Sequence, residues 1–285
     1  MKYWMTRAQE GMTLKEYLKS FYLGRGKIEQ IRAQKRYKIE QKTPKWEDAI
    51  LHEGDLLELD IEEAVDFTPV ERNLAILYED DYLLAISKTP DCVIYPEGKE
   101  GDDTLVNFIA GYYQAKGIHH TVRYVYRLDK ETSGVFLVAK DWLTEAHLCH
   151  QMEEGKIKKF YIALVEGKLK EKRGEIRKAI AKDRHANNRF RVDEKGKMAI
   201  TRYQVLKERE NTSLVQCELV TGRTHQIRVH FSSLGHPLVG DVFYGSKRKA
   251  KRTMLHASRI VFYHPFLERE FEIQAPLLEE MKGEK

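Results

Sequence analysis

One aspartate in a short polar loop is a candidate for covalent or electrostatic chemistry. Asp129 lies between two runs of strand-forming residues and is flanked by cations at Arg127 and Lys130. Nearby positive charge favours the ionised carboxylate, which suits a nucleophile or an electrostatic stabiliser rather than a general acid. A lone aspartate in a polar loop more commonly forms a turn, so this assignment needs support from other residues.

Two further segments hold side chains that could act on a bound substrate. Lys159 and Tyr161 lie in an apolar run that predicts a buried strand. Tyrosine in a strand usually packs inward, but its ring can also stack on a nucleobase and its hydroxyl can move a proton. Arg223 and Arg228 lie where a strand joins the start of a helix. Free amides and guanidinium groups there favour phosphate or carboxylate, and a surface arginine pair beside a capped helix is the alternative.

Nothing in the sequence predicts a metal or a nucleotide cofactor. The histidines at 147 and 150, or at 225, 230 and 236, lack the spacing of a zinc site, so capping, stacking or surface roles are expected. Phosphate-loop and dinucleotide-binding glycine motifs are absent, as is a Ser-His-Asp signature. The three cysteines, Cys92, Cys149 and Cys217, are far apart and are interpreted as small buried side chains.

The composition is that of a globular protein. The 285 residues are 42% hydrophobic and 33% charged. No apolar run of about eighteen residues predicts a membrane span, and the first residues do not have the pattern of a secretory signal. A cytoplasmic location is therefore expected.

The distribution of charge favours a polyanionic partner more than the net charge of +5 does. Eight basic and two acidic residues lie between 25 and 45, whereas 47–63 holds eight acidic residues and no basic one. The basic residues of the first segment are Arg25, Lys27, Arg32, Lys35, Arg36, Lys38, Lys42 and Lys45. A second basic cluster comprises Lys247, Arg248, Lys249, Lys251 and Arg252. Segregated clusters of this kind indicate nucleic-acid binding, with a solvated charged face as the alternative.

Local patterns divide the chain into a small module (1–63), a linker (64–73) and a larger unit (74–285). Thr13 and Glu16 have the spacing of a capping box at the start of a helix. A second helix is expected over 28–34 and a strand over 57–61, and the order resembles the small RNA-binding module of ribosomal small-subunit protein four. The strand that usually follows the second helix is degenerate in this sequence. The acidic stretch around Pro69 is read as the linker.

The larger unit mixes strands and helices without strict alternation. Strand-like runs cover 83–87, 122–126, 135–139, 160–165, 214–220 and 260–263, and helices are expected over 142–152 and 225–234. Since a helix does not separate every pair of strands, the pattern favours an α+β fold with a mixed, largely antiparallel sheet flanked by helices.

Five segments, in order, resemble the RluA-type ribosomal large-subunit pseudouridine synthase family. R-L-D-K-E-T-S-G-V-F-L-V-A-K at 127–140 is similar to its signature loop, and 78–88 to its opening pair of strands. K-x-Y followed by A-L-V-E-G, then T-G-R-T-H-Q-I-R-V-H at 221–230, then G-H-P-L-V-G-D with Leu255-His256-Ala257, follow in the family's order. The resemblance covers about residues 74 to 276.

The resemblance implies a role for each matching residue. Asp129 matches the catalytic aspartate, Tyr161 the tyrosine that stacks on the target base and can remove a proton from it, and Arg228 the arginine that pairs with the aspartate. Leu255 matches an apolar residue at the border of the pocket. The cations expected to contact RNA are Arg127, Lys159, Arg223, Arg25, Lys27, Arg32, Lys35 and Arg36.

The sequence also departs from the family's pattern. Tyr126 replaces the usual histidine before R-L-D, and Ser87 and Thr89 interrupt the usual N-K-P. Asp91 and Tyr95 replace a common glycine and histidine, and 181–183 lacks a proline-bearing segment. These differences bear on the choice of RNA more than on activity, because the aspartate, tyrosine and arginine are all present.

The implied reaction is the isomerisation of specific uridines in structured RNA to pseudouridine by a monomeric enzyme. No electrons or groups enter or leave, so the reaction needs no cofactor or metal, in keeping with the absent motifs. Large-subunit ribosomal RNA is the expected substrate. A transfer-RNA pseudouridine synthase of the same family and a non-catalytic RNA-binding ribosome assembly factor remain the alternatives.

Overall fold

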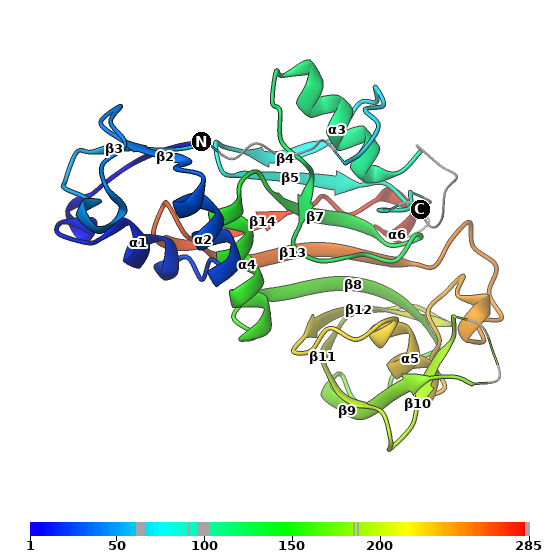
Figure 1. Cartoon of the computed structure of the whole chain (residues 1–285). Helices are drawn as coiled ribbons and strands as arrows, with labels where there is room; N and C mark the ends of the chain where they lie inside the picture. Colours follow the sequence, from blue (N-terminus) through cyan, green and yellow to red (C-terminus); the bar gives the residue numbers. More distant parts are fainter. Residues whose placement is uncertain (61–65, 91, 96–102, 185, 187, 283–285) are drawn as a thin grey trace.

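Two sheets organise the chain in the computed structural model, which describes residues 1–282 except 61–65, 91, 96–102, 185 and 187 (Figure 1). A three-stranded sheet in the order β1-β3-β2 lies near the N-terminus, and an eleven-stranded sheet organises the rest. The elements of the first unit are β1 (Lys2–Trp4), α1 (Leu14–Ser20), α2 (Arg25–Ala33), β2 (Tyr37–Ile39) and β3 (Leu56–Leu59), with 3-10 turns at Arg7–Gln9 and Trp46–Asp48.

The N-terminal module, residues 1–60, forms where local sequence signals specify it. The Thr13 hydroxyl accepts the Glu16 amide at 3.2 Å and the Glu16 carboxylate accepts the Thr13 amide at 2.9 Å, which confirms the capping box. Helix α2 begins earlier than predicted, at Arg25, and ends at Ala33. The strand that looks degenerate in the sequence is present as β2, three residues long, with a buried–exposed–buried pattern that pairs it with β3.

The large sheet follows the order β10-β9-β11-β12-β8-β13-β7-β5-β4, with β14 added to β13 and β6 added to β7. Its strands pair antiparallel except β13 with β7, which confirms the mixed, largely antiparallel prediction. The strands are β4 (Ile76–Glu79), β5 (Leu83–Lys88), β6 (Arg123–Tyr124), β7 (Ser133–Ala139), β8 (Lys158–Glu166), β9 (Arg173–Lys182), β10 (Phe190–Val192), β11 (Lys197–Glu208), β12 (Thr212–Leu219), β13 (Leu255–His264) and β14 (Arg269–Gln274).

Helices cover both faces of the sheet around β7, whose seven residues are all buried. The helices are α3 (Leu105–Ala115), α4 (Trp142–Glu153), α5 (Gln226–Ser233) and α6 (Glu279–Lys282), with a 3-10 turn at Val242–Tyr244. Phe136 and Val138 pack with α3, whereas Leu137 packs with Leu148 of α4 on the other face. A strand covered twice loses the alternation of apolar and polar residues. No helix in the described part of the chain is long and apolar enough to cross a bilayer.

A glycine allows the single parallel pairing beside the signature loop. Gly134 has φ +108°, and a Cβ at this position would lie 2.1 Å from the carbonyl oxygen of Ala257 on β13. Any side chain would therefore push β13 away from β7. The glycine of the motif R-L-D-K-E-T-S-G thus sets how closely the loop approaches the strand that carries Leu255.

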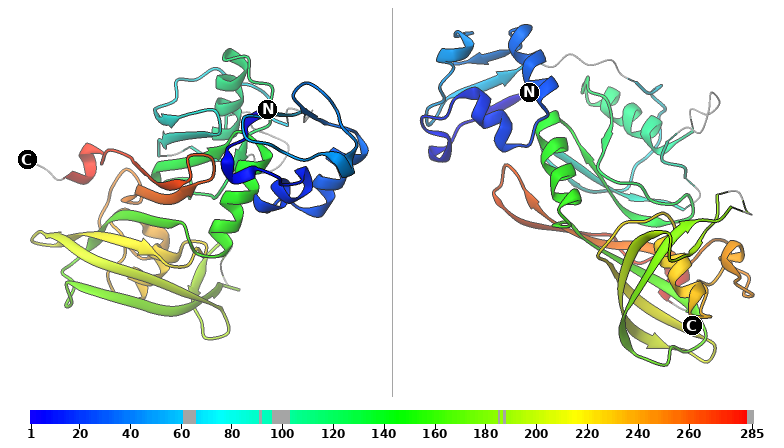
Figure 2. Two further views of the ribbon diagram at one scale, coloured as in Figure 1. Left: turned by 90° about the vertical axis from the view of Figure 1, so that its left-hand side faces the viewer. Right: turned by 60° about the horizontal axis from the view of Figure 1, so that its bottom comes forward.

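The N-terminal module packs against α4 and the β13–β14 hairpin, as both views of Figure 2 show. The ring of Tyr3 stacks on Phe266 at 5.3 Å between centroids, and Phe21 stacks on the same ring at 4.9 Å. The predicted linker is also in contact over its described part, since the Val70 amide donates to the Asn107 carbonyl of α3 at 3.0 Å. The domain boundaries themselves remain a prediction.

Candidate active site

The signature loop places Asp129 shortly before the first residue of β7, beside the central strands of the large sheet. Leu128 is buried in the main core, and the Thr132 amide closes a turn onto the Asp129 carbonyl at 3.0 Å. The Asp129 side chain is 28% exposed, whereas Arg127 and Lys130 on either side are exposed. The loop therefore presents one carboxylate, anchored from behind by an apolar side chain.

Arg228 of α5 pairs with this carboxylate. Its Nη1 lies 3.3 Å from Oδ2 of Asp129. Its remaining donors, Nε and Nη2, bind the two carboxylate oxygens of Asp241 at 2.7 and 2.9 Å. Asp241 is 1% exposed, and the Tyr244 ring lies 4.9 Å from the guanidinium carbon. The forked contact with Asp241 fixes the plane of the guanidinium and leaves one edge for Asp129.

The cation beside Asp129 is not one that the local sequence indicated. Among the described residues, the ion pair of Asp129 forms with Arg228 and not with its neighbours Arg127 or Lys130. Burial by itself lowers the pKa of Arg228, but the hydrogen bonds and charge of Asp241, together with Asp129, raise it above its ordinary value. Arg228 is therefore a permanent cation.

Tyr161 lies on the same face of the sheet as Leu255. Tyr161 is 6% exposed on β8, pairs in register with Ala257 of β13, and shares the main core with Leu255, which is 4% exposed. Burial, and then the charge of Asp129, raise the pKa of Tyr161. Its phenol is thus protonated at neutral pH and offers a flat, neutral ring.

Two buried cations hold the backbone of the signature loop. The Lys88 amine, 1% exposed, donates to the carbonyls of Lys130 at 2.7 Å and Thr132 at 2.8 Å. Arg252, 3% exposed, donates to the Glu131 carbonyl at 3.0 Å and pairs with Glu280. Because each cation is buried and bonded, the three residues that follow Asp129 in the loop are held in place.

A buried amide organises the segment before α5. Gln226 accepts hydrogen bonds from the Arg223 amide at 3.0 Å and the Thr221 hydroxyl at 2.8 Å, and donates to Ile200 and Thr201. His225 then takes a left-handed conformation with φ 55° at the start of α5. The predicted helix over 225–234 is confirmed, and the exposed Arg223 donates to the Met198 carbonyl at 3.2 Å.

His225 is a neighbour of the aspartate that the motifs leave without a role. Its Nε2 lies 3.8 Å from Oδ2 of Asp129, and its Nδ1 lies 2.7 Å from the Tyr244 hydroxyl. Burial lowers the pKa of His225, although the charge of Asp129 opposes this shift.

Tyr126, which replaces the usual histidine, packs against the sheet. Its hydroxyl donates to the Val135 carbonyl at 2.7 Å, and its ring lies 6.1 Å from that of Phe136. The Lys159 amine lies 5.9 Å from the centre of the same ring, and burial lowers the pKa of Lys159. Lys159, two residues before Tyr161 on β8, thus lies beside Tyr126, and its amine also contacts the Met152 sulfur at 3.3 Å.

The other departures from the family's pattern have ordinary structural roles. The Ser87 amide pairs with the Ala75 carbonyl at 2.7 Å, and the Thr89 carbonyl accepts from Lys88 at 3.0 Å. Tyr95 is 48% exposed and its ring contacts those of Phe67 and Tyr124. Asp91 lies outside the described residues.

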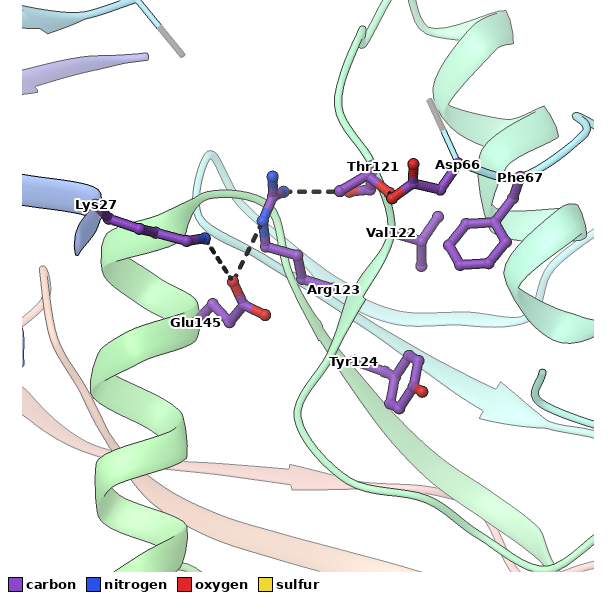
Figure 3. A pocket seen from close by; sticks show the side chains of 8 residues that line it. All are labelled: Lys27, Asp66, Phe67, Thr121, Val122, Arg123, Tyr124 and Glu145. Atoms are coloured by element: carbon purple, nitrogen blue, oxygen red, sulfur yellow. Dashed lines mark hydrogen bonds and ion pairs between the residues drawn. The ribbon is translucent and has the colours of Figure 1, made fainter. Parts of the chain in front are cut away.

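The basic residues of the N-terminal module do not form one free surface. Arg25 and Lys35 are exposed, Arg36 is half-buried, and Arg32 pairs with Glu29 at 3.1 Å. Lys27 instead points to the larger unit. It lies 3.8 Å above the Trp142 ring and 3.9 Å from Glu145, beside a cavity of about 510 Å³ (Figure 3). Lys27 is thus a junction residue, which sequence alone could not distinguish from its neighbours.

The second basic cluster is also smaller than predicted. Lys247, Arg248, Lys249 and Lys251 are exposed, but the buried Arg252 serves the signature loop. The Glu166 carboxylate accepts the Lys247 and Arg248 amides, each at 2.8 Å, and so holds the base of this turn.

The remaining histidines and cysteines have packing contacts. His147 and His150 contact aromatic rings, and Nδ1 of His230 lies 2.9 Å from the Thr201 hydroxyl. Within the residues that the structure describes, no cluster of three or more His, Cys, Asp or Glu side chains could hold a metal ion. Cys92 and Cys217 are buried as predicted, whereas Cys149 is half-buried.

Comparison with known proteins shows the family to which the chain belongs. A family model described as RNA pseudouridylate synthase matches residues 85–233, a span that contains Asp129, Tyr161 and Arg228. The chain belongs to this family. A Bacillus subtilis protein named uncharacterized RNA pseudouridine synthase YhcT is 41% identical over 239 residues, which cover 82% of this chain and 79% of that protein. Ribosomal large subunit pseudouridine synthase D of Zymomonas mobilis is 34% identical and covers 75% of this chain and 72% of its own length.

A solved structure supports the fold of this pseudouridine synthase. Human RNA pseudouridylate synthase domain containing 1 superimposes with a TM-score of 0.63 at 29% identity, over 73% of this chain and 86% of that one. The RluA-type resemblance and the assignment as an isomerase that acts on RNA are therefore confirmed.

Sequence reasoning left several partners of the site without a role. Asp241 lies in the motif G-H-P-L-V-G-D, and Gln226 lies in T-G-R-T-H-Q-I-R-V-H, so both were inside quoted motifs. Lys88 is 42 residues from the carbonyl of Lys130 that it binds. A polar residue inside a motif is the available signal for all three, since Lys88 ends the segment 78–88, but the partner of Lys88 is set only when the chain folds.

Proposed function

We propose that this pseudouridine synthase modifies uridines of large-subunit ribosomal RNA and that Asp129 is its catalytic residue. The observation that supports Asp129 is its carboxylate 3.3 Å from a guanidinium that Asp241 holds in a fixed plane. Relatives named ribosomal large subunit pseudouridine synthase D, 34% and 36% identical to this chain, support the choice of RNA.

The arrangement suits an isomerisation. The bond from the ribose carbon to the uracil nitrogen breaks, and the base turns. A new bond then forms from the same ribose carbon to a carbon of the uracil ring. This ring carbon loses its proton, and the freed nitrogen gains one. Asp129 acts on the ribose or the base, either as a nucleophile or as the acceptor of a proton. Arg228 orients the carboxylate through its hydrogen bond and its permanent positive charge.

Tyr161 is proposed to receive the flipped base on its ring. Removing a uridine from its stack costs a few kcal/mol, and stacking on an aromatic ring offsets part of that cost. The raised pKa of Tyr161 disfavours the phenolate. The tyrosine therefore acts as a stacking surface, and proton removal from the base is the less favoured of its two expected roles. Leu255 supplies an apolar border.

Three cations of the matching segments are proposed to bind the RNA backbone. Arg127 lies two residues before Asp129 in the signature loop, and Arg223 lies three residues before α5; both are exposed. Lys159 is half-buried beside Tyr126, two residues before Tyr161 on β8. Phosphate contacts of this kind position the nucleic acid and make binding depend on salt.

Asp129→Asn tests the proposal. We expect a loss of turnover of at least about a thousandfold, with RNA affinity changed by no more than about threefold, because the carboxylate acts in the reaction rather than in binding. Pseudouridine is mapped by chemical labelling in ribosomal and transfer RNA from a strain that lacks the gene. Asp81→Asn, at an exposed aspartate of the β4–β5 turn, is the matched control and should keep full activity.

The pattern of modified sites decides the substrate. If wild type but not Asp129→Asn modifies large-subunit ribosomal RNA, the proposal is supported. If the modified sites are confined to transfer RNA, the proposed substrate is wrong but the proposed role of Asp129 stands. Tight RNA binding without new sites from either protein would favour the non-catalytic assembly factor.

A further inference from the structure

A cavity of about 340 Å³ lies between the N-terminal module and the larger unit, and the proposed reaction does not use it. Tyr22, from the loop after α1, lies on the module's side. His147 and His150 of α4 and Tyr263 of β13 lie on the other side. Both units therefore build it, and its volume is within the range of small-molecule sites, about 300–1,000 Å³.

Tyr22 has an unfavourable backbone conformation for its residue type. It follows α1 with φ 62°, its amide donates to the Lys19 carbonyl at 2.8 Å, and the Leu23 amide donates to the Leu18 carbonyl at 3.3 Å. This is the Schellman arrangement, in which glycine is preferred at the left-handed position. A bulky aromatic there is an outlier. Tyr22 is also 49% exposed, so burial of its ring offsets little of this cost.

The ring of Tyr22 is held by stacking rather than by burial. It lies 3.5 Å from the ring of His150, with 18° between the planes, and 5.6 Å from His147. His147 lies in turn 6.4 Å from the ring of Tyr263, which is 44% exposed. Two exposed tyrosines with histidine rings beside them thus border one cavity.

The wall formed by Tyr263 is rigid. The buried Gln151 accepts the Tyr263 amide and donates to the Tyr263 carbonyl, each at 2.8 Å. Burial, and then the positive surroundings, lower the pKa of His147, so its ring is neutral at pH 7. A neutral, fixed aromatic border favours a flat partner over an ion.

The rim of the cavity adds one charge of each sign. Lys156, after α4, is exposed and can meet a phosphate, whereas Glu270 of β14 can only accept hydrogen bonds. Aromatic rings beside a cation are the arrangement with which proteins bind unpaired nucleotides.

We propose that this cavity binds one unpaired nucleobase of the RNA substrate in contact with the rings of both Tyr22 and Tyr263, with its phosphate near Lys156. The proposal rests on the proposed function in one respect, namely that the substrate is RNA. Adenine should bind better than uracil, because its larger ring system stacks more strongly and its amino group can donate to Glu270. The site is thus a second reading point, separate from the uridine at Asp129.

The test measures the affinity of the full-length protein for short single-stranded RNAs of equal length. The probes contain only adenine, only uracil, or adenine with abasic positions in the centre. Wild type should bind the adenine probe most tightly. Tyr22→Gly should weaken adenine binding about tenfold, the loss expected for one stacked base, and leave abasic binding unchanged. Glycine suits φ 62°, so the melting temperature should not fall.

Two further variants complete the design. Tyr263→Ala removes the opposite ring and should give a similar loss for adenine. Trp4→Ala removes an aromatic side chain that is 68% exposed on β1, outside the cavity, and should leave all affinities unchanged. Equal adenine affinities of wild type, Tyr22→Gly and Tyr263→Ala would overturn the proposal, as would equal losses for adenine and abasic probes.

Turnover on ribosomal RNA separates this inference from the function on which it rests. Unchanged adenine affinity in both tyrosine variants while wild type makes pseudouridine would reject the cavity alone. Wild type that makes no pseudouridine would reject the proposed substrate, whereas the adenine and abasic affinities would still decide whether a base occupies the cavity.

Discussion

The loop around Asp129 and the helix α2 were both expected to contact RNA, but the surrounding structure holds their side chains in different ways. Asp129 faces Arg228, which Asp241 holds, and the loop's carbonyls bind Lys88, so each partner behind the carboxylate is buried or nearly so. On α2 the basic side chains are exposed, apart from Lys27 at the junction, and Arg32 pairs only with a neighbour. The side chains around Asp129 are held in fixed positions, whereas those of α2 are exposed and contribute mainly positive charge.

The difference follows from the cost of burying charge. A buried cation is tolerated only with its hydrogen bonds satisfied, so its position is tightly specified and its removal is severe. An exposed cation contributes through the field it adds, and a neighbour can replace it. Substitutions should therefore have large, position-specific effects in the loop and small, additive effects on α2.

The largest effect on stability is expected at Lys88. Lys88→Met keeps the length of the side chain but leaves the carbonyls of Lys130 and Thr132 without their donor, which should lower the free energy of unfolding by about 3 kcal/mol. Urea unfolding at pH 7 measures it. Lys197→Met, at an exposed lysine on β11, is the control and should change stability by less than about 0.5 kcal/mol. Equal changes in the two variants would contradict the buried-cation account.

Asp241→Asn should affect catalysis more than folding. It removes the charge that holds the Arg228 plane while keeping one acceptor, and we expect kcat to fall about a hundredfold, about 2.7 kcal/mol in the barrier. Single-turnover assays with ribosomal RNA measure the step directly. The control, Glu272→Gln, breaks the more exposed ion pair with Arg259 and should leave kcat unchanged. A rise in KM with unchanged kcat would show that Asp241 serves binding instead.

The cations of the N-terminal module should act additively. Replacing Arg25, Lys35 and Lys38 with glutamine should weaken RNA binding about tenfold at physiological salt. The slope of log affinity against log salt should fall by roughly one for each phosphate that the variant no longer binds. Replacing Lys27 alone should leave the slope unchanged, because Lys27 lies against Trp142 and Glu145. If the salt slope of the triple variant is unchanged, these cations do not bind phosphates and form only a solvated charged surface.

The same contrast explains what could be predicted from the sequence. Asp129, Tyr161 and Arg228 could be named as candidates because each lies in a motif whose order is specific. Their buried supports were not, since the contact of Arg252 with Glu131 spans 121 residues and leaves no local pattern. Helix α3 (Leu105–Ala115) was missed because valine, isoleucine and two tyrosines favour a strand locally, and packing on the sheet overrides that preference.

Long charged strands were missed for the opposite reason. β9 (Arg173–Lys182) and β11 (Lys197–Glu208) carry lysine, arginine and alanine, which are common in helices. Their pairing over eight residue positions, from Lys197 with Ile180 to Gln204 with Arg173, supplies hydrogen bonds that no local signal indicates. Pairing between strands that are distant in sequence therefore depends on the whole sheet and cannot be predicted from either segment alone.

The smallest expected effect is a difference in pH dependence between a buried histidine of the large sheet and an exposed one of the N-terminal module. His256 is 0% exposed, its Nδ1 lies 2.9 Å from the Ser133 hydroxyl, and burial lowers its pKa. Its unfolded pKa is about 6.5. Below that pH, His256 is protonated in the unfolded chain but stays neutral in the folded chain. The stability present at pH 7 is therefore lost as the pH falls.

His52 should respond in the opposite direction. Its hydrogen bond with Glu10, at 2.9 Å, raises its pKa in the folded protein, so this bond stabilises the fold below the unfolded pKa, and the stabilisation disappears as the pH rises. Between pH 7.5 and 5.5, His256→Gln should therefore show a smaller loss of melting temperature than wild type, and His52→Gln a larger one. Parallel shifts in both variants would mean that neither local contact governs the acid response, and that other titrating groups dominate it. Opposite shifts would extend the contrast between buried and exposed groups from the signature loop to the pH dependence of the stability of the whole chain.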